Sequence, residues 1–91
     1  DDDYIVTTEE TVGAFTVNNT HDATISGVFS KAGYKPICWI PKFGYSANVN
    51  FNEEGTYIAN GELHFQGYAK LILSGSLSVT FKLLITWVRV S

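Results

Sequence analysis

Residues 45–52 read Tyr-Ser-Ala-Asn-Val-Asn-Phe-Asn, and their alternation decides the fold class of this chain. Apolar and polar side chains follow one another at every step, which is the two-residue period of a β-strand with one buried face. A shift of one residue in the pairing would put every apolar side chain in water, so the facing is well specified. The stretch therefore predicts a half-buried strand.

The same period continues outward from this stretch in both directions. We expect further strands at residues 11–17, 23–29, 34–43, 56–59, 62–66, 68–73 and 77–90. The segment 34–43 contains Pro36 and Pro41, which cannot donate to a ladder, so it should lie at a sheet edge or carry a bulge. Asn60-Gly61 predicts a hairpin with a type I′ turn, because both central residues of that turn need a positive φ. Exposed turns are expected at 31–33 and 53–55.

These elements predict one all-β domain. Seven or eight short strands separated by turns are typical of a sandwich or a barrel, and we favour a jelly-roll-like antiparallel β-sandwich. No window shows helical periodicity with start and stop signals. The sandwich is expected over residues 11–91, with residues 1–10 as a flexible or linker-derived segment because they open on three aspartates. The absence of methionine favours a fragment or a processed product.

The composition points to self-association. Only 16% of the 91 residues are charged whereas 45% are hydrophobic, and ordinary domains carry about 25% charged residues. A chain of this size buries only about 60–65% of its unfolded surface, and its single cysteine cannot form an intrachain disulfide. Apolar surface is therefore left over, which favours an oligomer.

The segments 36–43 and 84–90 carry apolar side chains on both faces of the expected strands. One face of each segment must therefore be covered by other residues. Another part of the same domain could supply that cover, or a second copy of the chain could. We favour a subunit interface. Its candidate residues are Cys38, Ile40, Leu84, Val88 and Val90.

The residues offer no catalytic or metal-binding set, and we expect no enzyme and no cofactor. His21 and His64 have no ligand-like spacing, and two histidines with one cysteine fall short of a structural zinc site. Cys38 stands between Ile37 and Trp39, where a thiol is usually an inert small hydrophobe. A net charge of −3 without a basic stripe argues against nucleic acid. No run of 18 apolar residues exists, so no membrane insertion is expected.

Tyrosines near turns and strand ends are the remaining candidates for a ligand site. Exposed tyrosines beside acidic and amide groups can stack on sugars and hydrogen-bond their hydroxyls. The alternative role for each is packing in the core or in an interface. The candidate ligand-binding residues are Tyr34, Tyr57, Tyr68, Glu53 and Glu54.

The segment 30–40 reads Ser-Lys-Ala-Gly-Tyr-Lys-Pro-Ile-Cys-Trp-Ile. It resembles a Gly-Tyr-x-Pro-Ile segment of short C-terminal β-domains in tail-fibre, receptor-binding and minor structural proteins of phages that infect Gram-positive gut bacteria. The Asn-rich strand, the Tyr-rich hairpin at 57–65 and the closing Trp-Val-Arg-Val at 87–90 follow in the same order. The resemblance covers residues 10–91. Pro41, Lys42 and the Glu53-Glu54 pair depart from the family pattern.

The resemblance implies a homotrimeric tip domain in the virion tail, with cell-surface polysaccharide as its partner. It supplies no catalytic residues. Two alternatives stay open at this point. One is a purely structural tail or baseplate domain, and the other is a carbohydrate-binding module of a secreted enzyme.

Overall fold

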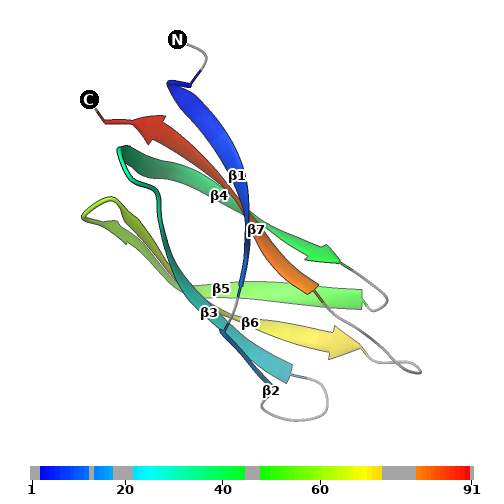
Figure 1. Ribbon diagram of the computed structural model, residues 1–91. Coiled ribbons are helices and arrows are strands. Elements are labelled where there is room, and N and C mark those ends of the chain that lie inside the picture. Colours follow the sequence, from blue (N-terminus) through cyan, green and yellow to red (C-terminus); the bar gives the residue numbers. More distant parts are fainter. Residues whose placement is uncertain (1–2, 13, 18–21, 45–47, 73–79, 91) are drawn as a thin grey trace.

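The computed structural model describes residues 3–12, 14–17, 22–44, 48–72 and 80–90, which form strands joined by turns (Figure 1). Two antiparallel sheets result, one in the order β1-β7-β4 and one in the order β2-β3-β6-β5. The strands are β1 (Ile5–Thr11), β2 (Ala14–Val17), β3 (Asp22–Ser30), β4 (Tyr34–Gly44), β5 (Asn48–Ala59), β6 (Glu62–Ile72) and β7 (Thr80–Arg89). The alternation therefore predicted the all-β class correctly.

The core lies between the two sheets. On the side of the three-stranded sheet, its central strand β7 contributes a row of buried side chains. Phe81, Leu83, Ile85 and Trp87 alternate with partly exposed residues and are all buried, as their spacing predicted. Residues 77–79 of the strand expected at 77–90 lie outside the described residues. Each fully buried Leu or Ile side chain stabilises the fold by about 1.5–3 kcal/mol before chain entropy is subtracted.

The four-stranded sheet completes the core from the other side. Its buried set alternates along β3 and β6 and comprises Ala23, Ile25, Leu63, Phe65 and Ala69. The rings of Phe65 and Phe81, one from each sheet, lie 5.6 Å apart, and Trp39 meets Phe65 edge-on at 5.1 Å. Aromatic contacts therefore join the two sheets.

Strand β4 is an edge strand with a bulge, as its prolines predicted. It lies at the edge of the β1-β7-β4 sheet, and its register shifts between Pro36 and Cys38. The turn predictions at 31–33 and at Asn60-Gly61 also hold. Gly33 has a φ of 82° in the turn before β4, and Asn60 and Gly61 have φ values of 55° and 78° in the β5–β6 hairpin.

Two expected strand breaks are absent. The segments predicted at 45–52 and 56–59 belong to one strand, β5, because Glu53-Glu54-Gly55 forms a bulge rather than a turn. The segments predicted at 62–66 and 68–73 form one strand, β6, which continues through Gly67. Of the stretch 45–52, residues 45–47 lie outside the described residues, and Phe51 packs against the core.

The segment 1–10, expected to be flexible or linker-derived, contains most of strand β1. Ile5–Thr11 forms β1, which pairs along its whole length with β7, from Ile5 opposite Val88 to Thr11 opposite Lys82. The backbone nitrogen of Arg89 also donates to the carbonyl of Tyr4 at 2.9 Å. Ladder hydrogen bonds hold this segment in place despite its acidic start.

Candidate functional site

The outer face of the four-stranded sheet, turned away from the core, carries a row of polar and aromatic side chains. Leu63, Phe65, Gly67 and Ala69 of β6 are buried, so His64, Gln66 and Tyr68 between them face outward. Cross-strand partners share a face. The pairing therefore adds Tyr57 and Val28 beside His64, Gly55 and Ser26 beside Gln66, and Asn52 and Thr24 beside Tyr68.

Two rings stack on this outer face. Tyr57 and His64 lie directly opposite each other in the β5–β6 pair, with ring centroids 4.4 Å apart and planes only 6° from parallel. Nε2 of His64 lies 3.5 Å from a carboxylate oxygen of Glu62. The Tyr57 side chain belongs to a residue that is 60% exposed. The two rings therefore stack face to face, and the Tyr57 side of the pair is open to solvent and ligands.

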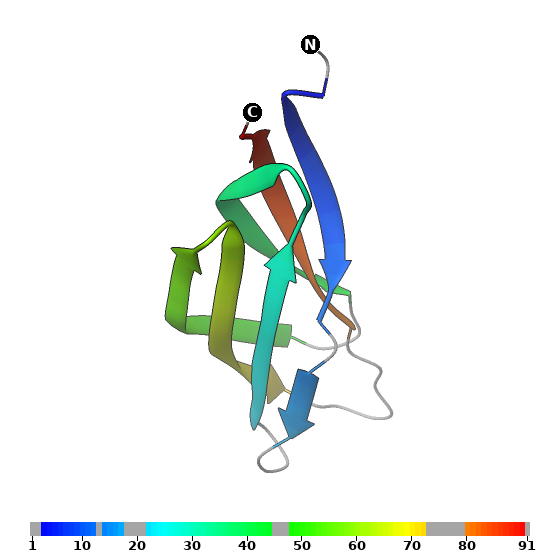
Figure 2. The same cartoon turned by 60° about the vertical axis from the view of Figure 1, so that its left-hand side comes forward.

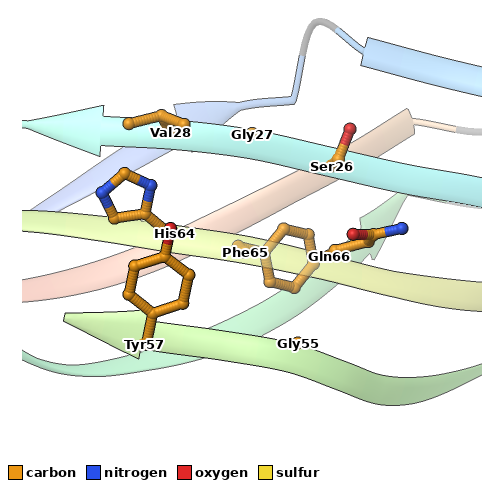
Figure 3. Close-up of a pocket in the computed structure, with 8 residues that line it drawn as sticks. All are labelled: Ser26, Gly27, Val28, Gly55, Tyr57, His64, Phe65 and Gln66. Atoms are coloured by element: carbon orange, nitrogen blue, oxygen red, sulfur yellow. The ribbon is translucent and has the colours of Figure 1, made fainter.

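A hollow of about 280 Å³ opens beside this ring pair. Figure 3 shows Val28, His64 and Tyr57 gathered at one end of the hollow, with Ser26 and Gln66 at the other. Gly55 leaves the floor open, because a Cβ atom there would meet only the Cβ of Gln66, at 4.0 Å. Because Gly55, at the end of the β5 bulge, has no side chain, the space beside Gln66 stays open as part of the hollow.

Four of the five predicted ligand residues lie on β5 and β6. Tyr57 and Tyr68 lie on the outer face of the four-stranded sheet and are 60% and 40% exposed. Glu53 and Glu54 are exposed in the bulge of β5. The structure does not bring Tyr34 to this face. Its hydroxyl donates to the carbonyl of Asp3 at 2.8 Å, and it packs against the core.

The predicted interface residues gather on the outer face of the three-stranded sheet. Ile40 is paired with Leu84, and Cys38 with Thr86, while Val88 lies between Ile5 and Lys35. Ile40 and Val90 are 56% and 55% exposed, Cys38 is exposed, and Leu84 and Val88 are half-buried. We call this set, together with Ile5 and Ile37, the apolar patch.

One end of the apolar patch is charged. Glu9 of β1 accepts hydrogen bonds from Lys42 Nζ at 2.9 Å and from Lys82 Nζ at 3.0 Å. The Lys42 hydrogen bond, followed by that from Lys82, lowers the pKa of the Glu9 carboxyl below its ordinary value. Ionic contacts therefore tie the three strands together at this end. The rest of the face carries the apolar side chains together with Thr7, Thr86 and Lys35.

Several of these residues escaped the sequence reasoning. His64 and Gln66 were missed, although they share a two-residue period with the predicted Tyr68, and this signal was visible in residues 62–70 if Gly67 was not taken as a break. Ser26 and Gly55 join them only through long-range pairing, for which no local signal exists. Ile5 belongs to the segment expected to be flexible, and Ile37 was not among the expected interface residues.

In the part of the chain that the structure describes, no group of three or more His, Cys, Asp or Glu side chains is placed to hold a metal ion. None of the described residues forms a helix long and apolar enough to cross a membrane. The prediction for His21 lies outside the described residues. Comparison with protein-family models, curated proteins and solved structures found no match. The fold and these two faces define an all-β, two-sheet protein.

Proposed function

We propose that this chain is a non-enzymatic attachment domain: a phage tail-fibre or receptor-binding tip that forms a homotrimer and binds cell-surface carbohydrate. The observation that carries the proposal is the outer face of the four-stranded sheet, where two exposed tyrosines stand among amide and hydroxyl side chains. The resemblance of residues 30–40 to phage tail domains gives the biological setting, the virion tail.

Carbohydrate is the ligand that best suits this outer face. The C–H faces of sugar rings pack on aromatic rings, and their hydroxyl groups need partners that both donate and accept hydrogen bonds. Tyr57 and Tyr68 offer exposed rings, while Asn52 and Gln66 beside them are exposed amides with both donor and acceptor atoms. An exposed surface of this kind suits weak contacts with sugars. The overall affinity increases when several copies of the domain bind one polysaccharide together.

The apolar patch supports self-association. In one isolated copy, Ile5, Ile37, Ile40 and Val90 are each more than half exposed. Clustered apolar surface of this kind marks association sites on soluble proteins. A homotrimer would cover the apolar patch and leave the outer face of the four-stranded sheet free for ligand. Three copies would also multiply the avidity for a repeating polysaccharide.

The strand order supports a shortened jelly roll as the finer fold. A jelly roll is a long hairpin rolled up, so its first strand pairs with its last and its second with its last but one. Here β1 pairs with β7 and β3 pairs with β6. Strand β4 then lies beside β7, and β5 lies beside β6. Apart from β2, which is an extra edge strand beside β3, this order is what remains when the fifth and sixth strands of an eight-stranded jelly roll are removed.

Two measurements test the proposed function together. Light scattering at micromolar concentration should give the mass of three copies, and labelled protein should bind host cells in competition with purified wall polysaccharide. Tyr57→Ala and Tyr68→Ala should each lower that binding at least tenfold while circular dichroism stays unchanged. Tyr4→Ala is the matched control, because Tyr4 is 51% exposed but lies outside this face.

Each other outcome points to a different protein. A trimer that binds no polysaccharide would indicate a structural tail or baseplate domain instead. A monomer that binds soluble polysaccharide would indicate a carbohydrate-binding module. A monomer without binding would overturn the proposal altogether.

A further inference from the structure

We infer that the hollow above Gly55 holds one neutral sugar ring, at the end or on a branch of the glycan, an inference that rests on the proposed function. The hollow lies between β3, β6 and β5 and is distinct from Tyr68, which stands one pairing row further along β6. The outer face would then have two parts. The hollow would select a sugar, and the open surface around Tyr68 would contact the rest of the chain.

The size of the hollow limits what it can take. Its volume of about 280 Å³ lies just below the range of roughly 300–1,000 Å³ found for sites of drug-sized ligands. This space suits one ring with its substituents rather than a run of several sugars. An extended polysaccharide threaded along a groove is therefore a poor fit, and a terminal or branch residue is a good one.

The two ends of the hollow match the two sides of a sugar ring. At one end, the stacked rings of Tyr57 and His64 and the side chain of Val28 form an apolar wall for C–H groups. At the other end, Ser26 and Gln66 provide a hydroxyl and an amide, which can each donate and accept. A neutral sugar needs this combination of one apolar wall and mixed polar partners.

The charges around the hollow exclude acidic sugars. No Lys or Arg is among the residues that line it, and the imidazole of His64 lies beside the carboxylate of Glu62. Glu53 and Glu54 add two exposed carboxylates on the strand next to Gly55. A carboxylate or phosphate group entering the hollow would lose water without gaining a cationic partner, which is unfavourable.

Gly55 provides the test, because it can be changed without disturbing the fold. It is not among the described residues with a positive φ, and a side chain there meets open space. Gly55→Val should therefore fold normally and fill the hollow. Ala32→Val is the matched control, since Ala32 is exposed in the turn before β4 and is not among the residues that line the hollow.

The experiment measures binding of the trimer to purified wall polysaccharide, followed by competition with single sugars. The probes are galactose, glucose, N-acetylglucosamine and rhamnose as neutral sugars, and glucuronic acid and N-acetylneuraminic acid as acidic ones. We expect at least one neutral sugar to compete at millimolar concentration and neither acidic sugar to do so. Gly55→Val should lose at least tenfold in affinity, and Ala32→Val should lose nothing.

Amide chemical shifts locate the bound sugar independently of the variants. On addition of the competing sugar, the amides of Gly55, His64 and Gln66 should move most. Polysaccharide binding that survives in Gly55→Val, or shifts centred on Tyr68, would overturn the hollow as the sugar site and leave the proposed function intact. Competition by an acidic sugar alone would overturn the neutral assignment. Absence of all polysaccharide and sugar binding would overturn both proposals.

Discussion

The indole nitrogen of Trp87 donates a hydrogen bond of 2.7 Å to the hydroxyl of Thr8, across the pairing of the first and last strands. Trp87 is completely buried, so its N–H group has no access to water. A buried donor without a partner costs about 1–3 kcal/mol. This hydrogen bond therefore helps to hold β1 against β7. The sequence of β1 itself gives little sign of a strand.

Thr8→Val should lower the free energy of unfolding by about 1–3 kcal/mol, because it removes the acceptor and keeps the shape. Urea denaturation followed by tryptophan fluorescence measures the change. Thr7→Val is the control, since Thr7 is exposed on the opposite face of β1 and should change stability by less than about 0.5 kcal/mol. Equal effects of the two variants would contradict the role given to Thr8.

Thr56→Val should act in the opposite direction. The hydroxyl oxygen of Thr56 is buried and makes no hydrogen bond within the described part of the chain. Replacing it with a methyl group of similar size removes that cost, so stability should stay equal or rise by about 1 kcal/mol. The midpoint of urea denaturation reports this change. A loss above about 1 kcal/mol would show that the hydroxyl has a partner in solution.

Gly67→Ala should destabilise the protein by about 1–3 kcal/mol or more. A Cβ atom at Gly67 would lie 2.6 Å from the carbonyl oxygen of Asn52 and would overlap the ring of Phe51. Phe51 covers this glycine from β5, so the ring and the backbone would both have to move. Gly55→Ala is the matched control and should be neutral, because a Cβ there meets nothing closer than 4.0 Å. Thermal unfolding of both variants tests this contrast.

The charged end of the apolar patch should make stability depend on pH. The folded-state pKa of Glu9 lies below its ordinary value of 4.5, so the unfolded chain takes up the proton first as pH falls. The stabilisation is fully present above pH 4.5 and is lost as pH falls through the lower folded-state pKa. Denaturation between pH 6 and 3 should show a smaller decrease for Glu9→Gln than for the wild type, and 0.5 M salt should reduce the difference. Identical pH profiles would contradict this linkage.

Ile40→Lys should separate the copies of the proposed trimer. Ile40 is 56% exposed beside Leu84, next to the charged end of the apolar patch, so a charged side chain there would lose water in an assembly. The variant should be monomeric by light scattering with an unchanged circular dichroism spectrum. Val28→Lys is the control, because Val28 is equally apolar and 58% exposed but lies on the other sheet. A variant that keeps the mass of the wild type would place the interface elsewhere.

Local pattern predicted much of this fold. The alternation in residues 81–87, the prolines of β4 and the Asn60-Gly61 turn each depend on a few neighbouring residues, and each prediction holds. The two missed continuities have a different origin. Gly67 is covered by Phe51 of another strand, and the bulge at Glu53–Gly55 bends a strand without ending it. Pairing partners decide both, and neither is visible along the chain.

The candidate site was predictable only in part. Tyr57 and Tyr68 were predicted by residue type alone, and the structure places both exposed on the outer face of the four-stranded sheet. Tyr34 was predicted in the same way, but its hydroxyl donates to the carbonyl of Asp3, 31 positions away, and it does not reach this face. The hollow needs Ser26 and Gly55 on either side of Gln66, and only the register of three strands places them there.

The place of β7 in its sheet has a consequence for how the chain folds. Both ladders of β7 run to strands that are distant in sequence, with Ile5 opposite Val88 and Tyr34 opposite Arg89. The β5–β6 hairpin, by contrast, closes over two residues. High contact order slows folding to milliseconds or seconds, because loop entropy is lost before distant contacts form. We therefore expect the hairpin that carries Tyr57 and His64 to form before the sheet that buries Trp87.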